Sequence, residues 1–226
     1  MRILVVTATA AEIGPLVAGL RWTADRGPRV ARYAGGAHEV DVLVSGVGMV
    51  ATATWVSRVL AGERHDLALN LGVCGSFDRT LEPGTVVHIV SDCLAELGAE
   101  DGDAFLTIQQ LRLLDENEPP FTGGRLVNQS PPANDALGGL RAVNGITVNT
   151  VHGHERSIAC VTKRFAPDVE SMEGAAFMYA CLIHGVPFAQ VRAVSNIVER
   201  RNRSAWKLPE AIARLSETAR RVIDHL

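Results

Sequence analysis

The chain has 226 residues, of which 47% are hydrophobic, 5% aromatic and 21% charged, and its formal net charge is −3. This composition excludes an intrinsically disordered chain, which would be poor in apolar residues, and no segment approaches the ~18 consecutive apolar residues of a membrane span. Because the near-neutral charge gives no basic surface for nucleic acid, we expect one domain, residues 1–226, that binds a small molecule and neither nucleic acid nor a membrane.

Apolar runs of strand length alternate with segments of helical periodicity along the chain. In chain order, the predicted elements are strand Arg2–Thr7, helix Ala11–Leu20, strands Arg29–Tyr33 and Val40–Ser45, helix Met49–Ala61, strands Leu67–Leu71, Thr85–Val90 and Ile146–Val151, helix Met172–His184, strand Phe188–Val194 and helix Leu208–Leu226. Asp115–Asp135, rich in proline, is predicted as an irregular surface excursion. The alternation predicts an α/β fold with a parallel or mixed sheet, in which ligands bind at the carboxyl ends of strands.

The four cysteines, Cys74, Cys93, Cys160 and Cys181, lie far apart and form no CxxC pair or zinc-type spacing. We expect buried free thiols and no metal site, because a chain with this apolar content needs no disulfides. The amino-terminal run Ile3–Val6 is shorter than the apolar core of a signal peptide, about 7–15 residues, so it predicts a buried strand in a cytoplasmic protein.

Polar residues cluster at four predicted strand or helix ends, namely Thr7–Glu12, Gly72–Ser76, Glu170–Glu173 and Arg192–Asn196. Gly72–Ser76 is predicted as the turn after a strand, and its two glycines fit either a tight turn or backbone close to a ligand. The helix dipole accounts for Glu12 and Glu173 individually. Two carboxylates at strand ends can also activate a water and stabilise a cationic sugar, which makes hydrolysis a candidate reaction.

The glycine pairs do not form a cofactor-binding motif. Gly46-Val47-Gly48 has Ala51 in place of the third glycine of a dinucleotide site and lacks the acidic residue expected after the next strand. No Gly-Lys-Ser/Thr motif is present either. We therefore expect no cofactor.

Five segments carry a resemblance to a known family: TATAAEIGPL, LGVCGSFDRTLEPGTVV, AELGAED, VESMEGAAFMYAC and VRAVSNIVERRNRSAWKLPEAI. Met-Glu-Gly-Ala-Ala and the Arg-x-x-Ser-Asn ending resemble the purine nucleoside phosphorylase/nucleosidase superfamily, and AELGAED and ERRNRSAWK resemble its futalosine hydrolase branch. The resemblance implies a three-layer α/β/α fold with a central mixed sheet, in a homo-oligomer that is often a dimer. It also implies N-ribosyl hydrolysis of futalosine, a purine nucleoside of an alternative menaquinone route, without cofactor or metal.

The same resemblance implies roles for individual residues. Glu12 would orient and deprotonate the attacking water beside Arg192, and Glu173 would bind the ribose hydroxyls over Met172. The remaining pocket-lining positions implied by the family are Gly72, Cys74, Gly75, Ser76 and Ser195. The chain lacks the phosphate loop of the superfamily's phosphorylases, which favours water over phosphate as the nucleophile.

The methylthioadenosine/adenosylhomocysteine nucleosidases, which this chain resembles, carry an Asp at the position of Asn196. In that family the Asp protonates the purine N7. An amide cannot be that acid, but it offers a donor and an acceptor. This suits hypoxanthine, the 6-oxopurine of futalosine. The alternatives are a methylthioadenosine/adenosylhomocysteine nucleosidase, a purine nucleoside phosphorylase or a nucleoside-binding module without turnover.

The carboxylate at the tail of futalosine requires a cation. The candidates are Arg200, Arg201 and Arg203, although a solvated charge run explains each of them equally well. The aromatic candidates for pocket walls are Phe77, Phe105 and Trp206. His152 and His154 lie in the segment that follows the base and ribose in the family, but their identities differ from the nucleosidase pattern and predict no role.

Overall fold

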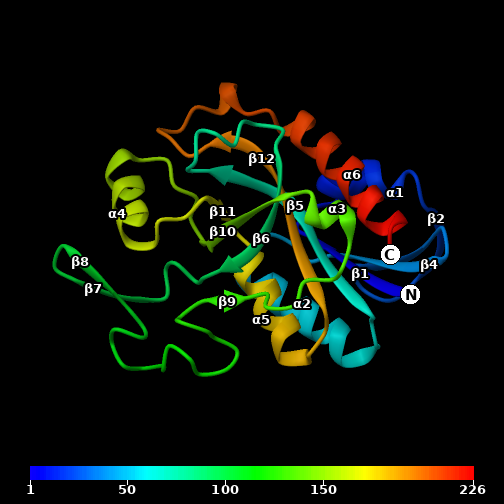
Figure 1. Ribbon diagram of the computed structural model, residues 1–226, viewed down its shortest axis with the longest axis horizontal. Helices are drawn as coiled ribbons and strands as arrows, with labels where there is room; N and C mark the ends of the chain where they lie inside the picture. The colour runs from blue at the N-terminus through cyan, green and yellow to red at the C-terminus, as the bar shows by residue number, and fades with distance from the viewer.

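A ten-stranded sheet runs through the computed structural model, which describes residues 1–226 (Figure 1). Its strands are β1 (Arg2–Thr7), β2 (Arg21–Asp25), β3 (Val30–Gly35), β4 (His38–Val44), β5 (Leu67–Ser76), β6 (Val86–Asp92), β9 (Leu126–Val127), β10 (Arg141–Thr147), β11 (Val169–Ser171) and β12 (Phe188–Ile197). A separate hairpin consists of β7 (Gly98–Asp101) and β8 (Ala104–Thr107). The helices are α1 (Ala10–Val17), α2 (Met49–Gly62), α3 (Asp135–Gly138), α4 (Glu155–Phe165), α5 (Gly174–His184) and α6 (Leu208–Asp224), and Arg203–Ala205 forms a 3-10 turn.

The strand order is β11-β10-β6-β12-β5-β1-β4-β3-β2, with β9 paired to β6. β5 is parallel to β1 and β12, which flank it in this order, whereas β12 is antiparallel to β6. The sheet is therefore mixed, as predicted. β11 pairs in parallel with β10 and in antiparallel fashion with β5, so that β5, β12, β6, β10 and β11 close into a ring.

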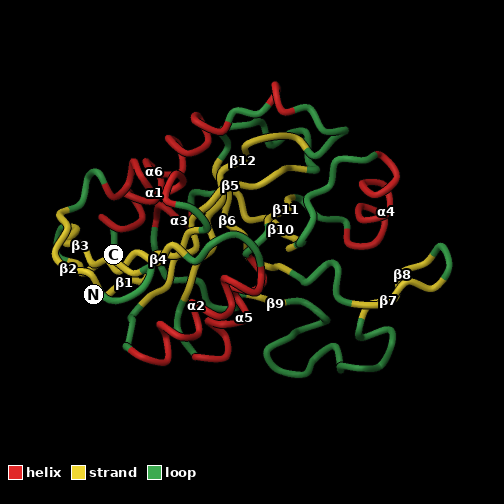
Figure 2. Tube along the Cα trace, turned by 180° about the vertical axis from the view of Figure 1, so that it is seen from behind, coloured by secondary structure: helices red, strands yellow, loops and turns green.

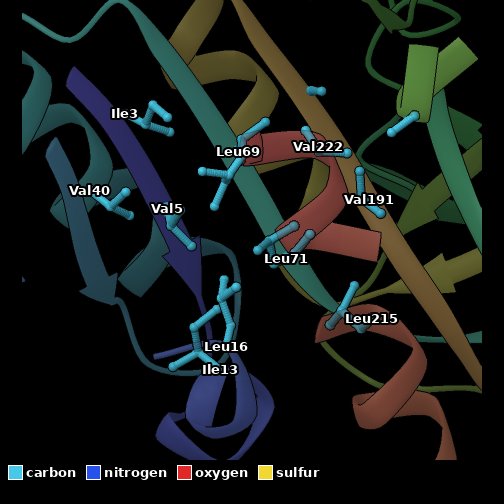
Figure 3. Close-up of a cluster of buried hydrophobic side chains, with 14 of the residues drawn as sticks. Ile3, Val5, Ile13, Leu16, Val40, Leu69, Leu71, Val191, Leu215 and Val222 are labelled. Carbon is cyan, nitrogen blue, oxygen red and sulfur yellow. The ribbon is translucent and has the colours of Figure 1, made fainter. Parts of the chain in front are cut away.

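Helices cover both faces of the sheet, which confirms the predicted three layers (Figures 1 and 2). Successive side chains of a strand point to opposite faces. Accordingly, Ile3 and Val5 of β1 pack with α1 and α6 in one core cluster, whereas Leu4 and Val6 pack with α2 and α5 in another. Figure 3 shows the first cluster, in which Leu16 and Leu215 approach the strand residues. No helix has the length and apolar content that crossing a bilayer requires.

Most predicted elements are present with ends shifted by a few residues. β1 matches its predicted bounds, α1 ends at Val17 instead of Leu20, and α6 ends at Asp224 instead of Leu226. The excursion Asp115–Asp135 contains only the two-residue strand β9 before α3 begins. The prediction of an irregular segment there is confirmed.

Three boundary predictions were wrong. Gly72–Ser76 is not a turn, because β5 continues to Ser76 with β12 paired beside it. The strand predicted at Ile146–Val151 begins earlier and ends earlier, as β10 at Arg141–Thr147. The helix predicted from Met172 begins at Gly174, with Glu173 as its N-cap residue. The last shift places the Glu173 carboxylate before the helix rather than inside its first turn.

Several elements were not predicted from the sequence: β2, the β7–β8 hairpin, β9, α3, α4 and β11. Each is short, polar or both. α4, for example, is a mostly polar helix in which only Val161 is fully buried. Figure 1 shows α4 and the β7–β8 hairpin beside the β10–β11 end of the sheet.

Candidate functional site

Three charged residues proposed from the sequence converge on β5 at Gly72. Glu12 comes from α1, Arg192 lies opposite Gly72 in β12, and Glu173 precedes α5. A methyl group added at Gly72 would clash with Nη1 of Arg192 and lie 3.1 Å from Oε1 of Glu12. Both side chains therefore lie over this glycine.

Glu12 is held by hydrogen bonds to α1 and to β5. Its Oε2 accepts hydrogen bonds from the Thr9 N–H at 3.0 Å and from Thr9 Oγ1 at 2.8 Å, and its Oε1 accepts one from the Val73 N–H at 3.1 Å. The residue is 8% exposed. The bond to the Thr9 N–H is half of a capping box. Since each carboxylate oxygen has two lone pairs, Oε1 can still accept a proton.

Glu173 and Arg192 form a buried ion pair. Oε2 of Glu173 lies 3.3 Å from Nη1 of Arg192, and the two side chains are 7% and 1% exposed. The other oxygen, Oε1, accepts a hydrogen bond of 3.1 Å from the N–H of Gly48, the N-cap residue of α2. Gly48 has φ of 96°, a conformation that favours glycine. Gly48, rejected above as part of a cofactor motif, thus orients a carboxylate of the candidate site.

Two polar residues that were not predicted from the sequence accept hydrogen bonds from Arg192. Its Nη2 donates to Oδ1 of Asn70 and its Nε to Oε1 of Gln190 at 3.4 Å. Gln190 in turn donates to Oδ2 of Asp92 at 3.1 Å, and burial raises the pKa of Asp92. Asn70 and Gln190 are polar residues inside the apolar strands β5 and β12. That position is the signal by which the sequence could have revealed them.

We expect Gly72→Ala to disrupt the site by displacing Arg192, because the added methyl group would overlap Nη1. Overpacking of a buried site costs about 1–3 kcal/mol, and the displaced guanidinium would release Glu173. The measurements are the free energy of unfolding in urea and kcat. Gly14→Ala is the matched control, since its added methyl group would contact nothing within 4 Å. Equal stability of the two variants would contradict the geometry.

A second group of residues lies further along β5. Gly75 is paired with Glu170 of β11 on one side and with Asn196 of β12 on the other. A methyl group built at Gly75 would lie 3.3 Å from Nδ2 of Asn196 and 3.6 Å from Cγ of Glu170. At about 3.3 Å per strand residue, Gly72 and Gly75 are ~10 Å apart. The two groups of residues therefore lie beside neighbouring parts of β5.

Asn196 is oriented by its neighbours in β12. Its Oδ1 accepts a hydrogen bond of 2.8 Å from Ser195 Oγ, and its Nδ2 donates to the Ile197 carbonyl at 3.0 Å. One N–H of Nδ2 remains for a ligand. Asn196 lines a cavity of about 160 Å³ together with His152, Arg201 and Trp206.

Other predicted pocket residues contribute less directly. The Cys74 side chain lies in the cluster inside the ring of strands, and burial raises the pKa of its thiol to about 12. Ser76 Oγ donates to the carbonyls of Asp78 and Asp168. No hydrogen bond joins either side chain to Glu12, Glu173 or Arg192. Met172 is half-buried beside Glu173.

The arginines and aromatic residues proposed to bind the tail of futalosine lie in two different parts of the structure. Only Arg201 of the three arginines lines the Asn196 cavity, where its guanidinium lies 5.4 Å from the Trp206 ring centroid. Phe77 packs edge-on against His152, with 6.3 Å between ring centroids. Phe105 instead lines a larger cavity, of about 860 Å³, beneath α4. No group of three or more His, Cys, Asp or Glu side chains is placed to hold a metal ion.

Known proteins resemble this chain both in sequence and in fold. The sequence model of the family described as Phosphorylase superfamily matches residues 2–226. The chain is 31% identical to a futalosine hydrolase from Acidothermus cellulolyticus over 223 residues, which cover 94% of this chain and 86% of that protein. It is also 31% identical to a futalosine hydrolase from Streptomyces coelicolor over 188 residues, covering 78% of this chain and 75% of that one. Its fold resembles an S-adenosylhomocysteine nucleosidase from Streptococcus pyogenes, with a TM-score of 0.82, 19% identity and coverage of 100% and 97% of the two chains.

Proposed function

The chain belongs to the phosphorylase superfamily, and from this premise we propose that it is an N-ribosyl hydrolase that cleaves futalosine into hypoxanthine and dehypoxanthine futalosine. The observation that carries the proposal is the combination of a buried carboxylate, Glu12, over Gly72 with an amide, Asn196, beside Gly75. The carboxylate suits water as the nucleophile, and the amide suits a 6-oxopurine as the base. The similarity to the futalosine hydrolases of Streptomyces coelicolor and Acidothermus cellulolyticus supports the same substrate.

In the proposed reaction, positive charge develops on the ribose and negative charge on the departing base. Glu12 takes a proton from the attacking water, while Glu173 accepts hydrogen bonds from the ribose hydroxyls that strengthen as the ring becomes cationic. Arg192 and the Gly48 N–H hold Glu173 in one orientation. Met172 packs under the sugar, and Ser195 orients Asn196 toward the base. The backbone from Gly72 through Cys74 and Gly75 to Ser76 forms the floor.

Four further statements belong to this proposal. The whole of residues 1–226 acts as one nucleosidase domain, it works in the cytoplasm, and its product enters menaquinone biosynthesis. It is also a homo-oligomer, most simply a dimer, because three apolar side chains remain exposed: Val47 just before α2, Val50 in α2 and Ile183 in α5. Light scattering that gives the mass of a monomer would contradict the dimer.

One experiment tests the proposed function. The protein is incubated with futalosine, methylthioadenosine or inosine, with and without phosphate, and the free base is quantified. We expect hypoxanthine from futalosine at a rate that phosphate does not change. Phosphate-dependent release would indicate a phosphorylase, adenine from methylthioadenosine would indicate the nucleosidase alternative, and no release would indicate a binding module.

We expect Asn196→Asp to shift the preference of the enzyme toward aminopurine nucleosides. A protonated carboxyl group can donate to N7 of adenine as an acid, which an amide cannot do. An unmatched polar group costs about 1–3 kcal/mol, so the ratio of kcat/KM for futalosine to that for methylthioadenosine falls by about 10-fold or more. Competition between the two substrates measures the ratio. An unchanged ratio would refute the assignment of Asn196 to the base.

We expect Arg201→Ala to raise KM for futalosine, but not for inosine, by about 10-fold, because a hydrogen bond to a charged group contributes about 1.5 kcal/mol. Arg200→Ala and Arg203→Ala are matched controls, since neither residue lines the Asn196 cavity. Equal increases of KM for both substrates would place Arg201 against the base or ribose instead of the tail.

A further inference from the structure

His152 forms a pair with Glu170 that the reaction outlined above does not use. Nδ1 of His152 lies 2.6 Å from Oε2 of Glu170, and the backbone N–H of His152 donates to Oε1 of the same carboxylate at 3.0 Å. The side chains are 14% and 4% exposed. Because an ionised carboxylate only accepts hydrogen bonds, Nδ1 carries a proton. This arrangement fixes which ring nitrogen faces away from Glu170.

The other ring nitrogen of His152, Nε2, makes no hydrogen bond within the protein. His152 lines the same cavity as Asn196, and its ring is held at an angle by the edge of Phe77. Glu170 and Asn196 are paired with the same residue of β5, Gly75, from its two sides. The pair thus lies beside Gly75, three residues along β5 from Gly72, at the end of the site that the proposed function assigns to the base.

We infer that His152, oriented by Glu170, is the proton donor to the departing purine. This inference rests on the proposed function. It supplies what that function lacks, since the amide of Asn196 cannot give up a proton to a leaving group. A carboxylate behind the ring stabilises the imidazolium, which then presents Nε2–H to the base.

The proton balance of the step is complete without another reactant. The C1′–N9 bond breaks with its electron pair passing to the purine, and the proton on Nε2 of His152 moves to the purine at N7 or O6. The oxygen of water forms the new bond to C1′, and its proton passes to Glu12. After the products leave, solvent returns the proton from Glu12 to His152. Asn196 donates to whichever of N7 and O6 does not face His152.

The test uses His152→Ala, Glu170→Gln and, as a matched control, His154→Asn. His154 is exposed, two residues away, and accepts a hydrogen bond at the N-terminus of α4, a place that Asn fills well. We expect kcat for futalosine to fall about 100-fold in His152→Ala, by less in Glu170→Gln, which acts only through His152, and within about twofold in His154→Asn. Circular dichroism verifies that each variant is folded.

Ligand analogues separate a donor from a structural residue. The dissociation constants of hypoxanthine, 7-deazahypoxanthine, which lacks N7, and purine, which lacks O6, are measured for the parent chain and for His152→Ala. We expect each missing acceptor atom to weaken binding to the parent about 10-fold, because one faces His152 and the other Asn196. In His152→Ala, the difference for one of the two atoms should disappear and the other should persist. If every ligand weakens by the same factor in the variant, His152 has only a structural role and the inference is wrong.

The outcomes also distinguish this inference from the proposed function. Parent-like kcat in His152→Ala overturns the inference while hypoxanthine release by the parent sustains the function. If the parent releases adenine from methylthioadenosine instead, the proposed substrate is wrong, and the same variants assayed with that nucleoside decide the role of His152.

Discussion

Glu12→Gln is expected to lower kcat for hypoxanthine release by about 1,000-fold, within the range of about 100–10,000-fold that general base catalysis contributes. Gln has the shape of Glu, but it cannot take a proton from water. Its amide nitrogen must also face the donor N–H of either Thr9 or Val73, both of which now donate to the carboxylate. We expect a stability loss of only about 1 kcal/mol from that mismatch. Single-turnover rates and urea unfolding measure the two effects.

Thr9→Val provides the control for this prediction. It removes the 2.8 Å hydrogen bond from Thr9 Oγ1 but keeps the backbone N–H that binds the same oxygen of Glu12. The carboxylate remains able to accept a proton, so kcat should fall by less than about 10-fold. A similar fall in both variants would mean that Glu12 acts by positioning α1 rather than by activating water.

The long elements could be predicted from the sequence because their apolar residues follow the pattern of burial. Continuous apolar runs identified β1 and β12, which are buried on both faces, and the helical period of Met49–Ala61 identified α2, which is buried on one. The same logic failed at β5. Gly72 and Gly75 suggested a turn, whereas they are strand residues whose missing side chains make room for Arg192 and Asn196. Inside a strand, a glycine can mark a site where another group approaches the backbone closely.

The candidate site divides in the same way. Glu12, Glu173, Arg192 and Asn196 were identified because they lie in short motifs with a recognisable pattern. Glu170 and His152 are 18 residues apart in the sequence and meet only because β11 closes the ring beside β5. Gln190 and Asp92 are 98 residues apart. Such pairs depend on sheet topology, and no local periodicity or spacing encodes them.

Arg192→Ala is expected to destabilise the fold by about 3–5 kcal/mol, because it leaves a buried partner without its counter-charge. Arg192 is 1% exposed and donates to Glu173, Asn70, Gln190 and the Val73 carbonyl. Arg192→Lys should recover little of this loss, since one ammonium group cannot reproduce the planar fork that reaches several acceptors. Urea unfolding measures the free energy of unfolding of each variant.

The decisive comparison is a double-mutant cycle of Arg192→Met, Glu173→Gln and the variant that combines them. If Glu173 and Arg192 mainly compensate each other, Arg192→Met combined with Glu173→Gln should be more stable than the sum of the two single losses predicts, by about 1–3 kcal/mol.

Activity should not return in the double variant, because the ribose hydroxyls still lack a charged acceptor as the sugar becomes cationic. Additive losses would mean that the ion pair contributes little, and that Asn70 and Gln190 alone hold Arg192 in place. Recovered activity would remove Glu173 from the ribose site. Stability and catalysis therefore report on separate properties of the same two side chains: the stability of the variants measures the buried ion pair, and their activity measures the role that the proposed reaction gives to Glu173.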